Sequence, residues 1–457
     1  EMHSRGNKRL TGSLPSRSNE RYYDAGKYSK RQVNAMYFCA GVLFIVLMFA
    51  LKGSLPSDTV IVLNKPKFRS HAGAGTSMFK IRHCTQSQAT EQGRLMAAAK
   101  VRGCSAQDDL WMKLVQLTMP DASVFIDIGS NKGYSAAEFF SLWKPELGFS
   151  PRTLYSQIQQ TAKLRELREC GACGDCNGEL EPLFDMQPRL CSGDAWKTSG
   201  ADSGALKRAG QALCSARKEN YKPIRVYSFD GNPRLVNGLT EVVAAFEDSG
   251  KLKPTDSLPT TPGASKMLAS SWSLENRAFT ETCSPGQELV FQLDGELGHI
   301  DGDNEDNPQR VKRRAKQGEA TKVSVPCSTF DQLMKREGLS HVDFAKIDTE
   351  GHDLSVLDGA IDALKGNKVT VFRFEYNVFW PETRNNLPPL QSITDELGKY
   401  GYVCYLEGKN ALIRLTYCWS DALGEKQWSN IFCFASNHPQ GAALISIFDS
   451  RSLAFLG

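Results

Sequence analysis

The sequence predicts an α/β fold, with a mostly parallel sheet and helices on both faces. Three observations predict it. Apolar strand-like runs alternate with helical runs through the second half of the chain, as is typical of parallel sheets. Several of these runs end in an acidic residue. The stretch VFIDIGSNKG, residues 124–133, has the pattern of a buried strand, a glycine turn and a helix start. Because open α/β sheets bind ligands at their carboxyl edge, we expect a ligand crevice there.

The turn after this first strand carries the first candidate site residues. Asp127 lies at the end of the strand. Gly129 would let a ligand approach the backbone, and Gly133 would let a helix from about Tyr134 begin close to the sheet. The amino end of that helix suits a carboxylate-bearing ligand. The spacing Asp-x-Gly-x-x-x-Gly is neither the dinucleotide motif nor the phosphate loop. A purely structural glycine turn is the alternative.

The elements on either side of this turn come next. We expect a helix over residues 107–119 and a second strand over residues 224–230, ending at Asp230. The two strands start about a hundred residues apart, whereas a strand–helix–strand unit needs only about thirty. Residues 145–222 are therefore predicted to be an insertion. Its cysteines favour disulfides over a metal site, and they are Cys170, Cys173, Cys176, Cys191 and Cys214.

The second half of the chain has a more regular pattern. One strand ends within residues 275–280, and another covers residues 288–293. A helix over residues 329–338 is expected to begin with Ser328 reaching toward Asp331 as a capping box. The remaining expected elements are strand 341–348 ending in Asp348, helix 351–364, strand 368–377 containing Glu375, helix 393–400, and two closing antiparallel edge strands, GYVCYLE and NIFCFA.

The N-terminal part predicts a membrane anchor. Residues 1–34 hold eight Lys or Arg against three acids, a formal charge of +5 that leaves −1 for the rest of a chain of net charge +4. The bulk of the chain thus has no basic field, which excludes nucleic acid as a partner. Residues 35–51 are uncharged and predict a transmembrane signal-anchor with the basic tail in the cytosol. A buried core helix is the alternative. Residues 52–105 would form a stem, and residues 441–457 a C-terminal tail.

This topology predicts a single-pass type II membrane protein of the Golgi or endoplasmic reticulum, with the main domain in the lumen. Twelve of the thirteen cysteines lie outside the anchor, an even number that suits disulfides in an oxidising compartment. One observation does not favour a lumenal domain. The chain contains no Asn-x-Ser/Thr glycosylation sequon, which a lumenal protein of this size often has.

The acids at the strand ends point to a nucleoside ligand. Asp127, Asp230, Asp348 and Glu375 follow four predicted strands, which would place them on one edge of the sheet. An acid after the second strand typically accepts the two ribose hydroxyls of a nucleoside. Because both phosphate-binding motifs are absent, the nucleoside that fits these acids and the glycine turn is S-adenosylmethionine.

Four segments resemble, in order, the signature segments of the FkbM family of S-adenosylmethionine-dependent methyltransferases. They are DIGSNKGYS, FDGNP, TFDQL and FAKIDTEGHDLSVLDGA, and KIDTEG is the most specific piece. The resemblance covers roughly residues 107–435. It implies a Rossmann-like class I methyltransferase domain over residues 106–440, interrupted by the insertion, and O-methylation of a hydroxyl. The chain departs from the family pattern in having Asp-Gly at residues 230–231 instead of Glu-Pro, which keeps the carboxylate.

The resemblance also implies roles for individual residues. Asp127, Gly129 and Gly133 would line the methionine half of the cofactor, Asp230 its ribose, and Ala278 its adenine. Asn131 and Asn232 lie in the same motifs and complete the expected cofactor-binding set.

The reaction needs a base, because an alcohol loses its proton as it attacks the methyl group. We expect catalytic acids among Asp348, Glu350 and Glu375, with Asp348 or Glu350 as the base. Alternatively, Asp348, Glu375 and Asn377 hold a divalent metal that lowers the pKa of the acceptor hydroxyl. Glu350 could instead form a structural ion pair with Lys346. The expected acceptor is a glycan. Lipid or small-molecule acceptors are alternatives, as is a non-catalytic scaffold with a retained fold.

Overall fold

The computed structural model describes residues 81–99, 109–161, 222–252, 270–293, 298–300, 321–407, 412–426, 429–449 and 452. The chain divides into two compact units, Glu1–Gly75 and Thr76–Gly457, and all described residues belong to the second. The predicted cytosolic tail 1–34, the anchor 35–51 and most of the insertion lie outside the described residues. Among the helices that are described, none is both long and apolar enough to span a bilayer.

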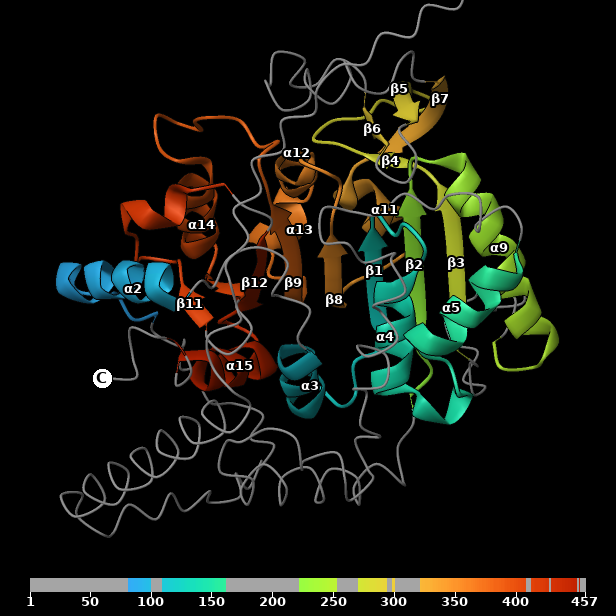
Figure 1. The fold of residues 1–457 in the computed structure, drawn as a ribbon, viewed down its shortest axis with the longest axis horizontal. Coiled ribbons are helices and arrows are strands. Elements are labelled where there is room, and N and C mark those ends of the chain that lie inside the picture. Colours follow the sequence, from blue (N-terminus) through green and yellow to red (C-terminus); the bar gives the residue numbers. More distant parts are fainter. Residues whose placement is uncertain are drawn as a thin grey trace, which may run out of the picture. The chain divides into compact units, whose positions relative to one another are not determined.

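A large eight-stranded sheet forms the centre of the domain (Figure 1). Its order is β11-β10-β12-β9-β8-β1-β2-β3. The strands are β1 Val124–Ile128, β2 Arg225–Asp230, β3 Ser271–Asn276, β8 Val342–Ile347, β9 Val369–Tyr376, β10 Tyr402–Glu407, β11 Leu412–Arg414 and β12 Ser429–Ala435.

The five strands from β3 to β9 pair in parallel, as the alternating pattern predicts. The rest of the sheet is mixed. Strand β12 pairs antiparallel with both β9 and β10, so β10 runs in the direction of the parallel strands. Strand β11 pairs antiparallel with β10 and forms the edge. GYVCYLE and NIFCFA pair antiparallel as expected, but the expectation that they are edge strands was wrong for both. Strand β10 lies between β11 and β12, and β12 lies between β10 and β9.

Two layers of helices cover the sheet, and side chains alternate between them because successive strand residues point to opposite faces. Phe125 and Phe344 pack in one cluster with helices α3, α4, α5, α9 and α15. Ile126 and Ala345 pack in the other with α11, α12, α13 and α14. The bounds are α3 Asp109–Thr118, α4 Tyr134–Trp143, α5 Pro151–Gln160, α9 Pro233–Asp248, α11 Phe330–Arg336, α12 Asp353–Asp358, α13 Ile361–Lys365, α14 Pro389–Lys399 and α15 Pro439–Asp449.

A second, four-stranded sheet lies at the carboxyl end of the large one, above β1 and β2 in Figure 1. Its order is β4-β7-β5-β6, with β4 Ala278–Phe279, β5 Glu288–Leu293, β6 His299–Ile300 and β7 Thr321–Ser328. Strand β4 continues the chain directly from β3, and a Cys283–Cys327 disulfide ties the loop after β4 to β7. This small sheet has its own apolar cluster, which includes Phe291 and Ile300.

Three predicted boundaries differ from the structure, because packing against distant segments decided them. Within the predicted stem, residues 86–99 form helix α2 Gln86–Ala99, whose Met96 is buried in the core. The predicted insertion starts later than residue 145, because α5 packs Leu154 and Ile158 into the domain. The predicted C-terminal tail begins as helix α15, with Leu444 and Phe448 fully buried.

Two local details also differ from the prediction. The capping box of α11 is formed by Thr329 and Gln332, one residue later than expected. Asp331 instead accepts hydrogen bonds from the backbone N–H groups of residues 362 and 363, at 2.9 and 2.8 Å, and so holds the start of α13. The single helix expected over residues 351–364 is two short helices, α12 and α13, interrupted at Gly359. A side chain there would overlap the carbonyl oxygen of Thr280.

Candidate active site

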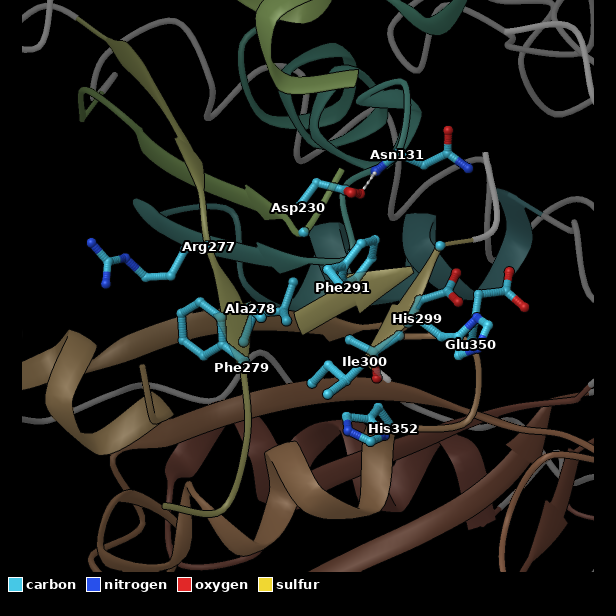
Figure 2. Close-up of a pocket in the computed structure, with 16 residues that line it drawn as sticks. Asn131, Asp230, Arg277, Ala278, Phe279, Phe291, His299, Ile300, Glu350 and His352 are labelled. Carbon is cyan, nitrogen blue, oxygen red and sulfur yellow. Dashed lines mark hydrogen bonds between the residues drawn. The ribbon is translucent and has the colours of Figure 1, made fainter. Parts of the chain in front are cut away.

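The candidate site lies where the strand order reverses. From β1 the chain continues to β2 on one side, and β8 pairs with β1 on the other, so the carboxyl ends of these strands diverge. A pocket of about 620 Å³ opens at this point. Its walls come from the turn after β1, the end of β2, the loop after β8 and the small sheet (Figure 2).

Asp230 lies in the wall of this pocket at the end of β2. Its Oδ2 accepts the backbone N–H of Asn131 at 2.9 Å, and its Oδ1 accepts that of Asn232 at 2.8 Å. Burial raises the pKa of Asp230 to about 6, although these two N–H groups favour the ionised form. Each oxygen keeps lone-pair capacity for a further donor. The carboxylate is therefore held by the backbone and can still accept two hydroxyl groups.

Lys346 links the ends of β1 and β8. Its Nζ donates to the carbonyl oxygen of Gly129 at 2.7 Å and lies 3.2 Å from Asp348 Oδ2 and 3.6 Å from Asp127 Oδ1. Burial lowers the pKa of Lys346, but the two carboxylates more than offset this, so that the pKa is raised. The ammonium therefore stays charged beneath the pocket.

Asp127 is fully buried, and neither of its carboxylate oxygens accepts a hydrogen bond from the described residues, although Lys346 Nζ lies 3.6 Å from Oδ1. Burial raises its pKa to about 6, with Lys346 acting in the opposite direction. It is not among the residues that line the pocket. Asp127 thus lies below the pocket floor, where it faces the lysine.

The glycine turn serves the packing of the chain itself. Gly129 lines the pocket, but a Cβ there would overlap the carbonyl oxygen of Asp348, so the loop after β8 fills the space expected for a ligand. Gly133 has φ +77° and precedes α4 as predicted, and a Cβ there would lie 2.8 Å from the ring of Trp272. Asn131, at φ +49°, lines the pocket.

Two further expected cofactor residues occupy different positions. Ala278, in β4, lines the pocket. Asn232 does not line it, and its side chain accepts the backbone N–H of Arg234 at 3.0 Å as the N-cap of α9. Asn232 therefore shapes the site through its backbone, which holds Asp230.

The loop after β8 brings Asp348, Glu350 and His352 to the pocket wall. Glu350 has φ +55°, a left-handed conformation that is uncommon for such a side chain. His352 is 8% exposed. Both predicted candidates for the base, Asp348 and Glu350, therefore lie at the same cavity as Asp230.

Asp353, which the sequence analysis did not single out, holds this loop. Its Oδ2 accepts from Thr349 Oγ1 at 3.2 Å, from Thr349 N at 3.4 Å and from Gly351 N at 3.3 Å, and its Oδ1 accepts from Glu375 N at 3.1 Å. The donors on either side of Glu350 thus converge on one carboxylate. Asp353 is fully buried, and burial raises its pKa to about 7.

Glu375 and Asn377 lie behind this loop and do not line the pocket. Burial raises the pKa of Glu375 well above its usual value. The amide of Asn377 donates to Glu375 Oε2 at 2.6 Å, and its oxygen accepts the backbone N–H of Phe379 at 2.9 Å. Within the described parts of the chain, no group of three or more His, Cys, Asp or Glu residues is placed to hold a metal ion. The expected metal set of Asp348, Glu375 and Asn377 is therefore not supported.

Sequence reasoning missed the side of the pocket formed by the small sheet. Phe279, Phe291, His299 and Ile300 all line it, together with Arg277. Their strands are short and pair with segments distant in sequence, and no local motif marks them. The only available signal was the pair of apolar runs at residues 275–280 and 288–293.

The fold is that of an α/β protein with a pocket at the carboxyl edge of its parallel strands. The model of the FkbM methyltransferase domain family matches residues 127–404, more than half of the chain. The chain belongs to this family of methyltransferases.

A solved methyltransferase FkbM structure from Methylobacillus flagellatus KT is similar at 10% identity and a TM-score of 0.26, over 76% of this chain and 98% of the other. No curated protein matches the chain.

Proposed function

We propose that the protein is an S-adenosylmethionine-dependent O-methyltransferase that acts on a glycan hydroxyl in the lumen of the secretory pathway. One observation carries this proposal. Asp230, Asp348 and Glu350, from the ends of two strands, border a single pocket at the reversal of the strand order.

The residues present fit the cofactor. Asp230 retains acceptor capacity for two ribose hydroxyls, since only one backbone N–H binds each of its oxygens. The carboxylates of Asp348 and Glu350 at the pocket wall suit a sulfonium cation. Ala278, with the aromatic and aliphatic side chains of the small sheet, offers an apolar wall to a base. When bound, the cofactor supplies a methyl group activated by the sulfonium.

The chain's own groups would then position and deprotonate the acceptor. Asp348 or Glu350 would accept the hydroxyl proton, because both border the pocket. Asp348 forms an ion pair with Lys346, whose Nζ lies 3.2 Å from Asp348 Oδ2 and holds the carboxylate at the pocket wall. Burial by the small sheet would exclude water from the reacting groups.

Three disulfides within the described part of the chain support the proposed lumenal location. They join Cys84 to Cys418, Cys283 to Cys327, and Cys404 to Cys433. Disulfides form and persist in oxidising compartments and are rare in the cytosol. Together with the uncharged stretch at residues 35–51, they favour a type II membrane protein of the Golgi or endoplasmic reticulum.

Methyl transfer to glycans tests the proposal. Glycans released from cells that lack the protein would be incubated with the purified full chain and S-adenosylmethionine carrying a deuterated methyl group, and then analysed by mass spectrometry. We expect the labelled methyl group on a glycan fragment, and none with the Asp348→Asn variant. If the methyl group is transferred only to lipids or small metabolites, the glycan assignment is wrong and the acceptor belongs to one of those classes. Absence of both cofactor binding and transfer would leave the scaffold alternative.

A further inference from the structure

Phe291, in strand β5, is fitted between two glycines. A Cβ added to Gly231 would overlap its ring, with Cδ2 at 2.6 Å and Cζ at 2.8 Å. A Cβ added to Gly298 would also overlap the ring, with Cζ at 2.7 Å. Neither glycine is among those with a positive φ. Both positions therefore need glycine for the space of the ring and not for an unusual backbone conformation.

This arrangement places the ring beside the proposed nucleoside site. Gly231 directly follows Asp230, and both line the pocket together with Phe291. Figure 2 shows the ring between Asp230 on one side and Ile300 on the other, with Ala278 close by. Phe291 is 8% exposed and packs with Ala278, Ile300 and Val325 of the small sheet. The small sheet thus presents an aromatic side chain to the cavity next to the carboxylate proposed for the ribose.

We propose that Phe291 is a cofactor-binding residue whose ring stacks on the purine base, and that Gly231 and Gly298 provide the space that holds the ring there. The proposal deepens the proposed function and rests on it. It accounts for the Asp-Gly sequence at residues 230–231, because any side chain at residue 231 would displace the ring. It also gives the small sheet a role in recognising the base.

The alternative is that Phe291 only fills the core of the small sheet. The two possibilities differ in what a leucine would do at this position. Leucine is apolar and of similar bulk, so it preserves most of the packing but has no aromatic face. Stacking of a base on an aromatic side chain contributes about 1–3 kcal/mol, which corresponds to a roughly 5- to 150-fold change in affinity.

Titration calorimetry of the full chain with S-adenosylhomocysteine tests whether Phe291 stacks on the base. We expect Phe291→Leu to bind the ligand about 5- to 150-fold more weakly than the unmodified chain. Val290→Ala is the matched control, because Val290 precedes Phe291 in the same strand, is 47% exposed and does not line the pocket; its affinity should be unchanged. Unfolding temperatures of both variants check that each is folded. Equal affinity of Phe291→Leu and the unmodified chain would overturn the proposal.

The role of Gly231 in holding the ring is tested by combining two substitutions. Gly231→Ala should weaken binding by displacing the ring, whereas adding it to Phe291→Leu should cause little further loss, because the aromatic face is already absent. If the losses of binding free energy from the two substitutions are fully additive, Gly231 does not act by holding the ring of Phe291 in place. If the unmodified chain binds neither S-adenosylhomocysteine nor S-adenosylmethionine, the proposed function itself fails, an outcome that is distinct from equal binding by the variant.

Discussion

Asp353 shows how one buried carboxylate can set the shape of a loop that carries candidate catalytic groups. Its partners are backbone N–H groups and a hydroxyl from Thr349, Gly351 and Glu375. No lysine or arginine is paired with it among the ion pairs of the described residues. Its charge is therefore stabilised only by neutral donors, which agrees with a pKa raised by burial.

This raised pKa predicts a pH-dependent stability. The pKa of Asp353 rises from 3.8 to about 7 on folding, so the folded state binds more protons between these values. The free energy of unfolding then falls as the pH rises through this window. Asp353→Asn should therefore reduce the dependence of the unfolding free energy on pH between about pH 4 and pH 7. Denaturant unfolding at several pH values measures it, with Asp121→Asn, in an exposed turn, as the control. An unchanged slope would show that Asp353 does not titrate in this range.

Asp348 allows catalysis to be separated from binding. Asp348→Asn keeps the size of the side chain but removes its ability to accept a proton at neutral pH. We expect turnover to fall by about 100-fold or more, with cofactor affinity changed by less than about threefold. Radiolabelled methyl transfer and a binding titration measure the two quantities. Retained turnover would leave Glu350 as the remaining base candidate at the pocket wall.

Helices α12 and α13 illustrate what the sequence could and could not predict about elements. The spacing of Leu354, Leu357, Ile361 and Leu364 predicts one inward helical face. Leu357 and Leu364 lie in the core and Leu354 packs against it, whereas Ile361 is only partly buried. They do not show the interruption at Gly359, where a side chain would overlap the carbonyl oxygen of Thr280, about eighty residues earlier in the chain. Similarly, the acids at the ends of β1, β2 and β8 could be predicted from local patterns. The pocket wall of the small sheet could not, since it depends on long-range pairing.

Gly359 gives a test of this packing. Gly359→Ala should destabilise the domain by about 1–3 kcal/mol, because the added methyl group overlaps the carbonyl oxygen of Thr280. Gly424→Ala is the control, since the nearest atom to a Cβ there lies 3.7 Å away. Denaturant midpoints measure both variants. Equal stability of the two would show that the turn at Gly359 does not approach the backbone of Thr280 as described.

At the scale of the whole domain, segments that are distant in sequence are linked to one another near strand β11, at the edge of the large sheet. Cys84 is joined to Cys418, and Gln92 of α2 donates to the carbonyl oxygen of Arg414 at 2.6 Å. The buried guanidinium of Arg414 in turn pairs with Asp449 of α15 at 2.8 Å. Sequence patterns assigned α2 to a stem and α15 to a tail, because neither the disulfide pairing nor the buried ion pair is visible locally.

The disulfide between Cys84 and Cys418 should hold α2 on the domain. Replacing both cysteines by serine removes this link, so amide hydrogen exchange in residues 86–99 should accelerate by about tenfold or more. Exchange in β8, far from the link, should not change. Hydrogen-exchange mass spectrometry of the full chain measures both segments. Unaltered protection of α2 would mean that its packing alone fixes it.

Equilibrium binding of S-adenosylmethionine to the full chain tests the central claim, that carboxylates at neighbouring strand ends form a nucleoside site. The unmodified chain should bind. Asp230→Ala should bind about 10- to 100-fold more weakly, because charge-assisted hydrogen bonds to the ribose contribute about 1.5–3 kcal/mol. Since burial raises the pKa of Asp230 to about 6, affinity should also increase from about pH 5 to pH 8 as the carboxylate ionises. Absence of binding, or equal affinity of Asp230→Ala, would contradict the account.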